Sequence, residues 1–265
     1  MRQVFTLATA LALYGLSGAA AAQDMLGHVD LTSPDMVDAE MTRAQLETML
    51  AAASSDKPAD LTGKKLSGLD LSGLNLSGAI LRAARLNGTK LVGARLDHVI
   101  LDQAWLLEAD LSRASLQGAA LFASQMQRAK LQGADLSGAR IAADLTNASL
   151  VGASLAGARL APDMRNQSMG LMRAVLKSAN LQGANLRGAD LSRTDLEFAS
   201  FKDADLTDAS LKGAALGGAD LSGATLAGAD FSGADLASAR LIAPVGLDSA
   251  RNLDKALNLE RAVRE

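Results

Sequence analysis

Residues 184–192 read ANLRGADLS, and this stretch decides the fold. Its two leucines, Leu186 and Leu191, are five residues apart, and an alanine precedes each of them by two positions. The same unit extends in both directions over residues 59–243 and is centred on thirty-six large apolar residues, nearly all leucine. The centres run every five residues from Leu61 to Ile141, then from Leu145 to Leu160 one residue out of phase, and from Leu171 to Leu241 in the original phase.

A period of five residues excludes a long α-helix. At about 100° per residue, successive leucines would scatter around every side of a helix. In an extended chain, side chains two residues apart point the same way, so the alanine and the leucine of one unit both face inward. The remaining small and polar residues must then turn the chain. Repetition of that turn coils the chain into an all-β solenoid, whose repeats bury apolar side chains only against their neighbours.

The same stretch resembles the A-(D/N)-L-x-x repeats of the pentapeptide-repeat family, and the resemblance covers residues 59–243. It implies a right-handed quadrilateral β-helix with four pentapeptides in each coil. At the usual spacing between strands, the thirty-six units would form about nine coils and a rod on the order of 40 Å long. The composition agrees, because 49% of the residues are hydrophobic but only 3% are aromatic. A lumen packed with leucine and alanine holds few rings.

Residues 1–22 have the features of a secretory signal peptide. A positive start at Arg2 precedes an apolar run from Val4 to Leu16, and small residues lead to an expected cleavage site after Ala22. The alternative is an uncleaved membrane anchor, but the run is shorter than the roughly 20 apolar residues that span a bilayer. We therefore expect a periplasmic or secreted bacterial protein with no membrane span after cleavage.

The N-terminal end of the solenoid is expected to carry a helical cap, because an open end exposes unpaired strand edges. Residues 23–58 form the tail that contains it. Within this tail, residues 42–53 predict a helix whose capping box is made by Thr42 and Gln45. Its apolar stripe consists of Leu46, Met49 and Leu50. The alternative is that this helix is an independent interaction element.

Residues 244–265 are expected to form the C-terminal cap. Pro244 ends the repeat pattern, and residues 248–263 predict a short α-helix with Asp248 as its N-cap. The side chains expected to cover the last coil are Leu253, Leu257 and Val263.

The repeat is interrupted within residues 142–170. One residue is missing between Ile141 and Leu145 and one is gained between Leu160 and Leu171, so the phase is restored after six whole units. A slipped coil followed by a bulge at residues 161–170 is the simplest interpretation, since such insertions are tolerated at the surface. The bulge could instead be a loop that contacts a partner, because loops often carry function.

The sequence lacks the residue patterns of enzymes and metal sites. Its two histidines, His28 and His98, lie far apart, it has no cysteine, and no catalytic triad or zinc motif occurs. Asp203, Asp205 and Asp208 are interleaved with lysines, which favours solvated carboxylates over a calcium site. We therefore expect a non-enzymatic protein with no cofactor and no metal. The net charge of -3 gives no basic footprint for nucleic acid.

Charged residues recur every 20 positions in one part of the repeats. They are Asp70, Lys90, Asp110 and Lys130, and each directly precedes a central leucine. With four units per coil, they stack on one face with alternating sign. The pattern predicts a structural salt-bridge ladder, in which each rung is worth a few tenths to about 1 kcal/mol.

Large apolar residues gather at outward positions along one edge of the predicted rod. They are Ile80, Ile100, Trp105, Leu107 and Phe122. Exposed apolar patches usually mark an interface and Trp is enriched in binding hot spots, so we expect this patch to bind a protein partner or a second copy of the chain. The alternative is that the N-terminal helix or the 161–170 bulge covers it. Nearby arginines favour an acidic rim on the partner.

Two functions follow from these observations. The favoured one is a protein-interaction or scaffold module of the bacterial envelope. The other follows from the resemblance, because some cytoplasmic pentapeptide-repeat proteins mimic DNA and inhibit gyrase through an acidic face on a two-fold dimer. A DNA-mimic inhibitor of a topoisomerase such as gyrase needs a cytoplasmic location. This sequence departs from that type in its export signal and in residues 59–141, where ten bases outnumber seven acids.

Overall fold

The computed structural model describes residues 29–54, 56–162 and 173–264. The expected signal peptide at residues 1–22, His28 and most of the expected bulge at residues 161–170 lie outside these ranges. The chain divides into two units, Met1–Leu31 and Thr32–Glu265, and the second unit contains all the repeats.

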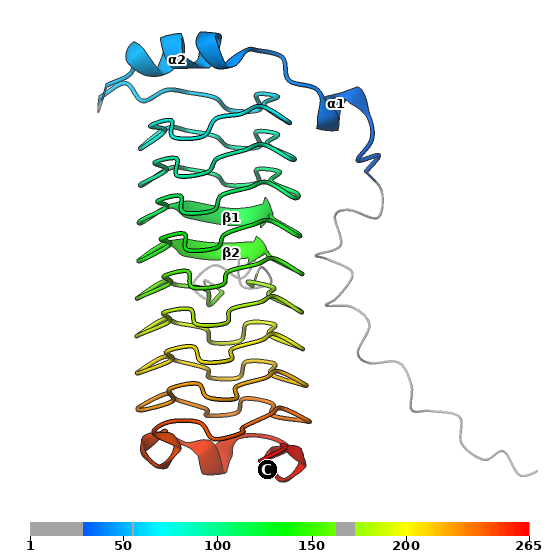
Figure 1. The fold of residues 1–265 in the computed structure, drawn as a ribbon, viewed down its shortest axis with the longest axis vertical. Helices are drawn as coiled ribbons and strands as arrows, with labels where there is room; N and C mark the ends of the chain where they lie inside the picture. The colour runs from blue at the N-terminus through cyan, green and yellow to red at the C-terminus, as the bar shows by residue number, and fades with distance from the viewer. Residues whose placement is uncertain (1–28, 55, 163–172, 265) are drawn as a thin grey trace, which may run out of the picture. The chain divides into compact units, whose positions relative to one another are not determined.

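The repeats of the second unit stack as coils along a rod (Figure 1), and four columns of bridges show that each coil has four sides. Parallel bridges join residues 20 positions apart, as in the pairs Asp60 with Ile80 and Lys65 with Arg85. We name the four faces by the first outward residue of each column of bridges: face A starts at Asp60, face B at Lys65, face C at Asp70 and face D at Asn75. This interval is the one that four pentapeptides give, so each face shows one unit from every coil.

Hydrogen bonds explain why each unit makes one side and one corner. The Leu186 N–H donates to the carbonyl of Asp205 in the next coil, and the Asn185 N–H donates to the carbonyl of Ala153 in the preceding coil. The corner residue Gly188 has a φ of 62°, a left-handed conformation that glycine adopts without strain. Every side is therefore bonded both upward and downward along the rod.

The core is the lumen of the rod. The central leucines and the alanines two positions before them are fully buried; Leu116 is 0% exposed and Ala114 is 1% exposed. The outward residue between them, Ser115, is half-buried. Phe201 and Phe231 are the largest fully buried side chains. The inward direction that the sequence predicts for leucine and alanine is therefore the direction in the structure.

The break in the repeat begins with two paired strands. Strand β1 (Ala120–Gln125) and strand β2 (Arg140–Asp144) run parallel, and their register shifts between Phe122 and Gln125. One residue is lost here, because Lys130 pairs with Ser149, 19 positions away. The next four bridges connect residues 31 positions apart. The first joins Asp144 with Val175 and the last joins Arg159 with Asp190. The insertion therefore lies between Leu160 and Val175, and the side centred on Leu176 is in the original phase.

The N-terminal helix has the predicted capping box. Helix α2 (Arg43–Ala51) begins after Thr42, whose hydroxyl accepts a hydrogen bond from the Gln45 N–H while the Gln45 side chain accepts one from the Thr42 N–H. Leu46 is completely buried in the core cluster and Leu50 packs against it. Met49, which we expected in the apolar stripe, is 36% exposed. A short helix that the sequence analysis missed, α1 (Pro34–Val37), precedes α2.

The predicted C-terminal α-helix is wrong. Residues 244–263 continue the bridge columns as a wider coil, in which Thr225 pairs with Val245, Asp230 with Arg251, Asp235 with Leu257 and Arg240 with Val263. Its corners are three 3-10 turns, η2 (Leu247–Ser249), η3 (Leu253–Lys255) and η4 (Leu259–Arg261).

Asp248 lies inside η2 and is not an N-cap; Gly246 precedes the turn with a φ of 72°. The physical reason is a six-residue repeat, LDSARN-LDKALN-LERAVR, at residues 247–264. It keeps leucine and alanine three positions apart, as the pentapeptides do. Their side chains therefore still meet the core.

Candidate functional site

The predicted apolar patch lies on faces A and B of the coils near the N-terminal end of the rod. Ile80 and Ile100 pair with each other on face A, and Trp105 pairs with Arg85 on face B. The structure leaves Ile80, Ile100, Trp105 and Phe122 half-buried. Leu107 is only 6% exposed, so it does not belong to an accessible surface and the patch is smaller than expected.

A segment from the N-terminal part of the second unit is bound beside this edge. Residues 33–40, which we call the strap, contain α1 and lie along the first coils (Figure 1). Ala39 makes an antiparallel bridge with Leu66, and the Glu40 N–H donates to the carbonyl of Lys65. The strap therefore adds one short backbone pairing to face B of the first coil.

Side chains of the strap complete its attachment to the rod. Lys65 Nζ lies 2.5 Å from Asp35 Oδ1, and Lys64 Nζ lies 2.9 Å from Glu40 Oε1. The hydrogen bond from Lys65 and the charge of the same lysine lower the pKa of the Asp35 carboxyl, and the Arg85 charge lowers it further. The strap is thus an acidic segment held by cations of face B.

Asn87 connects the strap to the buried end of the predicted patch. Its Nδ2 donates to the carbonyl of Met36, a residue that is 4% exposed, and its Oδ1 accepts a hydrogen bond from the Leu107 N–H. The N-terminal segment therefore contacts the same corner of the rod as Leu107. Leu107 is therefore buried at a corner that the strap reaches through Asn87, while the other four apolar residues stay a predicted patch.

The predicted salt-bridge ladder is wrong in its contacts. Asp70, Lys90, Asp110 and Lys130 do occupy successive rungs of face C. Among the described residues, however, no ion pair joins any two of them. Oδ1 of Asp70 accepts a hydrogen bond from the Ser72 N–H and lies 4.0 Å from Arg43 Nη1, and Oδ1 of Asp110 accepts a hydrogen bond from the Ser112 N–H. Each carboxylate turns back to cap its own corner, as aspartate does in Asx turns.

Ion pairs between coils follow a different spacing from the predicted one. A cation just after a central leucine reaches the aspartate just before the central leucine of the next coil, 18 positions later. Lys212 Nζ lies 3.3 Å from Asp230 Oδ2, and Lys202 Nζ lies 3.4 Å from Asp220 Oδ2. Other pairs are 20 positions apart, such as Arg128 with Glu108 at 2.8 Å. Ion pairs between neighbouring coils therefore join residues either 18 or 20 positions apart.

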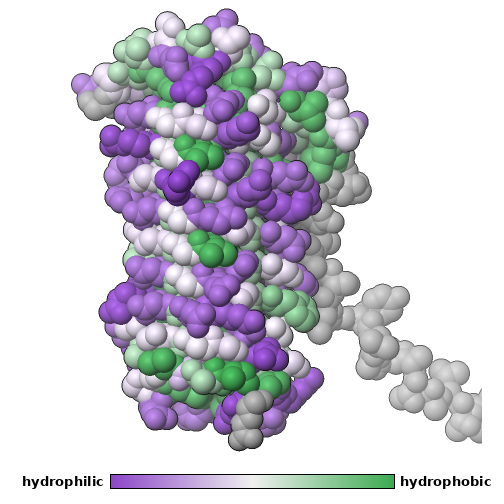
Figure 2. Space-filling model, viewed as in Figure 1, coloured by the Kyte–Doolittle hydropathy of each residue, from purple (hydrophilic) through white to green (hydrophobic). Residues whose placement is uncertain are grey.

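Three of the six exposed large apolar side chains in the described ranges lie on the last described coil; the other three, Val37, Met49 and Phe198, are scattered. Val245 is 58% exposed, Leu257 is 56% exposed and Val263 is 40% exposed. They occupy the outward positions of three of its sides, and apolar surface is visible at the end of the rod that carries the C-terminus (Figure 2). We call these three residues the apolar rim. Sequence reasoning missed the rim because it placed Leu257 and Val263 on a helix facing the core; the six-residue repeat was the signal that could have found it.

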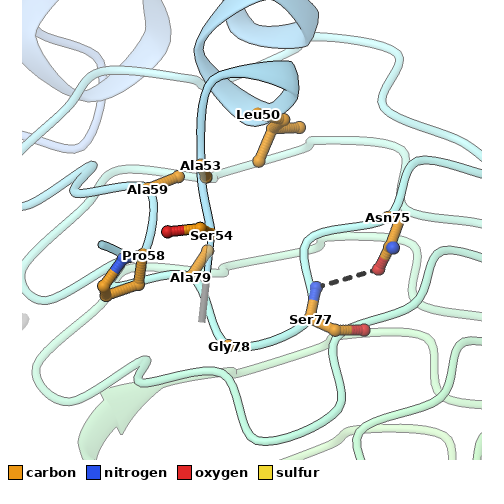
Figure 3. Close-up of a pocket in the computed structure, with 9 residues that line it drawn as sticks. All are labelled: Leu50, Ala53, Ser54, Pro58, Ala59, Asn75, Ser77, Gly78 and Ala79. Carbon is orange, nitrogen blue, oxygen red and sulfur yellow. Dashed lines mark hydrogen bonds between the residues drawn. The ribbon is translucent and has the colours of Figure 1, made fainter. Parts of the chain in front are cut away.

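A small cavity lies between the end of α2 and the first coils (Figure 3). Its volume is about 230 Å³. The described residues that line it, among them Leu50, Ser54 and Pro58, include no titratable side chain. Asn75 Oδ1 is already engaged by the Ser77 N–H. The lining therefore offers a small, mostly neutral surface with no acid, base or nucleophile pair.

The described residues offer little else for chemistry. His98 lies at a corner with a φ of 56°, and its ring leans over Gly118 of the next coil, where any added Cβ would lie 2.6 Å from Nδ1. Within residues 29–54, 56–162 and 173–264, no three histidine, cysteine, aspartate or glutamate side chains gather to hold a metal ion. Over the same ranges, no helix has the length and apolar character needed to cross a bilayer.

Comparison with known proteins identifies the repeat. A family model described as pentapeptide repeats matches eight copies in the chain, over residues 59–97, 89–124, 106–141, 121–161, 171–208 and 204–241. No curated protein matches the sequence.

Solved structures of repeat proteins are also similar to the chain. HetL of the cyanobacterium Nostoc sp., a pentapeptide repeat protein involved in heterocyst differentiation regulation, is 28% identical over 84% of this chain and 94% of its own, with a TM-score of 0.42. A trypsin-treated form of QnrB1, a plasmid-mediated fluoroquinolone resistance protein, is 19% identical over 77% of this chain and 85% of its own, with a TM-score of 0.44. A thylakoid-lumen protein of Arabidopsis thaliana is 27% identical over 52% of this chain and 68% of its own, with a TM-score of 0.16.

Proposed function

The chain belongs to the pentapeptide-repeat family, whose members form right-handed quadrilateral β-helices, and we propose that it is a non-enzymatic protein-interaction module of the bacterial envelope. In this proposal the rod is exported and binds another envelope protein or a second copy of itself. Pentapeptide-repeat proteins generally serve as structural or interaction modules, which supports the general class. The export and the envelope location rest on the signal-peptide features of residues 1–22.

One observation carries the interaction role: the apolar rim. Outward positions elsewhere on the lower coils are held by residues such as Asp220, Ser210 and Asn185. At Val245, Leu257 and Val263 the same positions are apolar and exposed. Water-exposed apolar side chains that gather in one region usually mark an interface, because burying them against a partner is favourable by about 25 cal/mol per Å².

The charge pattern supports this role over DNA mimicry. A DNA mimic needs a surface of unpaired acids that imitates phosphates. In the lower coils, by contrast, Asp205, Asp220 and Asp230 are each paired with a lysine or arginine of a neighbouring coil.

The test combines cell fractionation with site-specific crosslinking. A tagged full-length chain carries a photo-crosslinking amino acid at Leu257 in the rim, or at the exposed residue Gln182 as the matched control. We expect the chain in the periplasmic fraction and a discrete crosslinked species, either a hetero-complex or a dimer, from the Leu257 position only. Retention in the cytoplasm, or equal crosslinking from both positions, would contradict the proposal.

A further inference from the structure

Two bridges in the described part of the chain place one cation directly opposite another. Lys65 pairs with Arg85 on face B, and Arg140 pairs with Arg159 on face A. Bridged residues lie about 4.8 Å apart along the rod, and like charges at that distance destabilise a sheet. We therefore expect an acidic side chain near each pair, where its charge would offset the repulsion between the two cations.

The first pair has its counter-charge within the chain. Asp35 of the strap accepts a hydrogen bond from Lys65, and the Arg85 charge also stabilises the Asp35 carboxylate. The strap brings apolar contact as well, because Met36 beside Asp35 is buried. Residues 34–40, with the sequence PDMVDAE, therefore show that a short acidic segment can dock on a cation pair of this rod.

In the part of the chain that the structure describes, the second pair has no acid bound to it as Asp35 is bound to the first. Arg140 and Arg159 are both exposed, and neither forms an ion pair with any acid in the described ranges. The acid on the next rung, Asp190, turns its Oδ1 to the Ser192 N–H. Elsewhere on the rod, neighbouring coils supply acids to cations such as Lys212 and Arg187. Within the described residues, Arg140 and Arg159 therefore present two unpaired guanidinium groups to solvent, and Asp190 is the next acid on face A.

Apolar residues of the predicted patch lie directly above this pair. Ile80, Ile100, Ala120, Arg140 and Arg159 occupy successive rungs of face A. Phe122 lies on the same face, where it pairs with Ala142. Four rungs span roughly 19 Å, which an extended segment of about six residues covers. Face A thus offers an apolar stretch that ends in two arginines.

We propose that face A docks a short acidic segment of a protein partner, with its carboxylates on Arg140 and Arg159 and its apolar side chains on Ile100 and Phe122. Two guanidinium groups on adjacent rungs can donate to one or two carboxylates, and arginine matches the planar carboxylate in geometry. This inference deepens the proposed interaction function and rests on it.

The test uses a peptide with the sequence of the strap, residues 33–40 (SPDMVDAE), as the probe. In the full chain, the strap already occupies face B, which leaves face A for a peptide added in trans. Binding is followed by the shifts of the arginine Nε–H signals in NMR spectra. We expect saturable binding that shifts the Arg140 and Arg159 signals and that weakens as salt is raised.

Matched variants make the result specific. The double variant Arg140→Ser with Arg159→Ser should weaken peptide binding at least tenfold. The control Arg128→Ser with Arg187→Ser removes the same charge from arginines that are already paired with Glu108 and Asp205, and it should change binding less than twofold. A control peptide in which the acids are replaced, Asp35→Asn, Asp38→Asn and Glu40→Gln, should not bind.

Several outcomes would overturn the inference. No saturable binding up to millimolar peptide, or equal loss in both double variants, would show that face A has no acidic-segment site. Displacement of the peptide by an equal concentration of inorganic phosphate would show a general anion site instead. A lower melting temperature for Arg159→Ser would show that the pair stabilises the rod; relief of repulsion predicts a rise of roughly 1 °C. These outcomes leave the fractionation and Leu257 crosslinking results unchanged, so the two proposals fail separately.

Discussion

Residues 176–241 and residues 244–263 build the same rod with sides of different length. In a pentapeptide side, the left-handed residue sits between the leucine and the next alanine, as Gly188 does, and its N–H donates to the next coil. In the last coil the left-handed residues, Gly246, Asn252 and Asn258, come just before the leucines instead, and a 3-10 turn joins leucine to alanine.

The comparison shows which part of the repeat is essential. Both kinds of side keep an alanine three residues after each leucine, closed by a hydrogen bond from the alanine N–H to the leucine carbonyl, as between Ala184 and Leu181 and between Ala256 and Leu253. The extra residue in the long side is placed outside this inward pair. Inward spacing therefore defines the rod, and the length of the corner can change as long as the inward pair is kept.

The largest expected effect comes from charging the lumen. Leu116→Asp places an unpaired carboxylate in a completely buried site, so we expect a loss of more than about 4 kcal/mol of unfolding free energy. Leu253→Asp in the last coil should lose about 1–2 kcal/mol, because Leu253 is only half-buried. Ser115→Ala, at the neighbouring outward position, is the control and should cost only about 1 kcal/mol, because it removes one hydrogen bond to Asp97. Denaturant melts measure all three, and equal losses at positions 115 and 116 would show that the inward face is misassigned.

A smaller effect is expected at the first corner of the last coil. An added Cβ at Gly246 would lie 2.9 Å from Ala227 Cβ and 3.2 Å from its backbone, at a φ of 72°. Gly246→Ala should therefore lose roughly 2–3 kcal/mol, from left-handed strain and from overpacking. Gly138→Ala has open space around it and should lose only about 1 kcal/mol from its φ. Equal melting temperatures for the two variants would contradict the packing of the last coil on the coil above.

A third effect depends on pH. Burial raises the pKa of Asp230, but hydrogen bonds from Asn252, from the Ser232 N–H and from Lys212 lower it more, so the pKa lies below its usual value. Asp230 therefore stabilises the fold fully above its usual pKa of about 3.9, and this contribution is lost as the pH falls through the lowered value.

Asp230→Asn removes the titrating group that links the two kinds of coil. We expect a loss of about 1 kcal/mol at neutral pH and a smaller drop in melting temperature between pH 5 and pH 3 than in the unaltered chain. Ser210→Ala, on the rung above Asp230, is the control and should keep the original pH profile. An unchanged profile in Asp230→Asn would mean that the carboxylate does not hold the last coil.

The sequence alone predicted the repeats because five-residue spacing is a local property. It also located the capping box of α2, whose Thr42 and Gln45 are three residues apart. The strap could not be found in the same way, because Asn87 and Met36 are 51 positions apart and only folding brings them together. The short helix α1 did have a signal, since Pro34 follows Ser33 at a helix start.

Two errors at the site have identifiable causes. The C-terminal helix was predicted because Leu253 and Leu257 are four residues apart, which hid the six-residue interval from Leu253 to Leu259. The salt-bridge ladder was predicted from charge order at an interval of 20 residues, whereas pairs such as Lys212 with Asp230 join residues 18 positions apart.

Amide hydrogen exchange over residues 245–263 tests the wide coil most directly. The N–H groups of Val245, Arg251, Leu257 and Val263 donate to carbonyls of the coil above, and we expect them to be protected. The N–H groups of Leu253 and Asp254 donate to no backbone carbonyl in the described structure and should exchange fast. Protection that recurs every six residues is the predicted result. Continuous protection from residue 252 to residue 263 would indicate an α-helix and would contradict the wide coil.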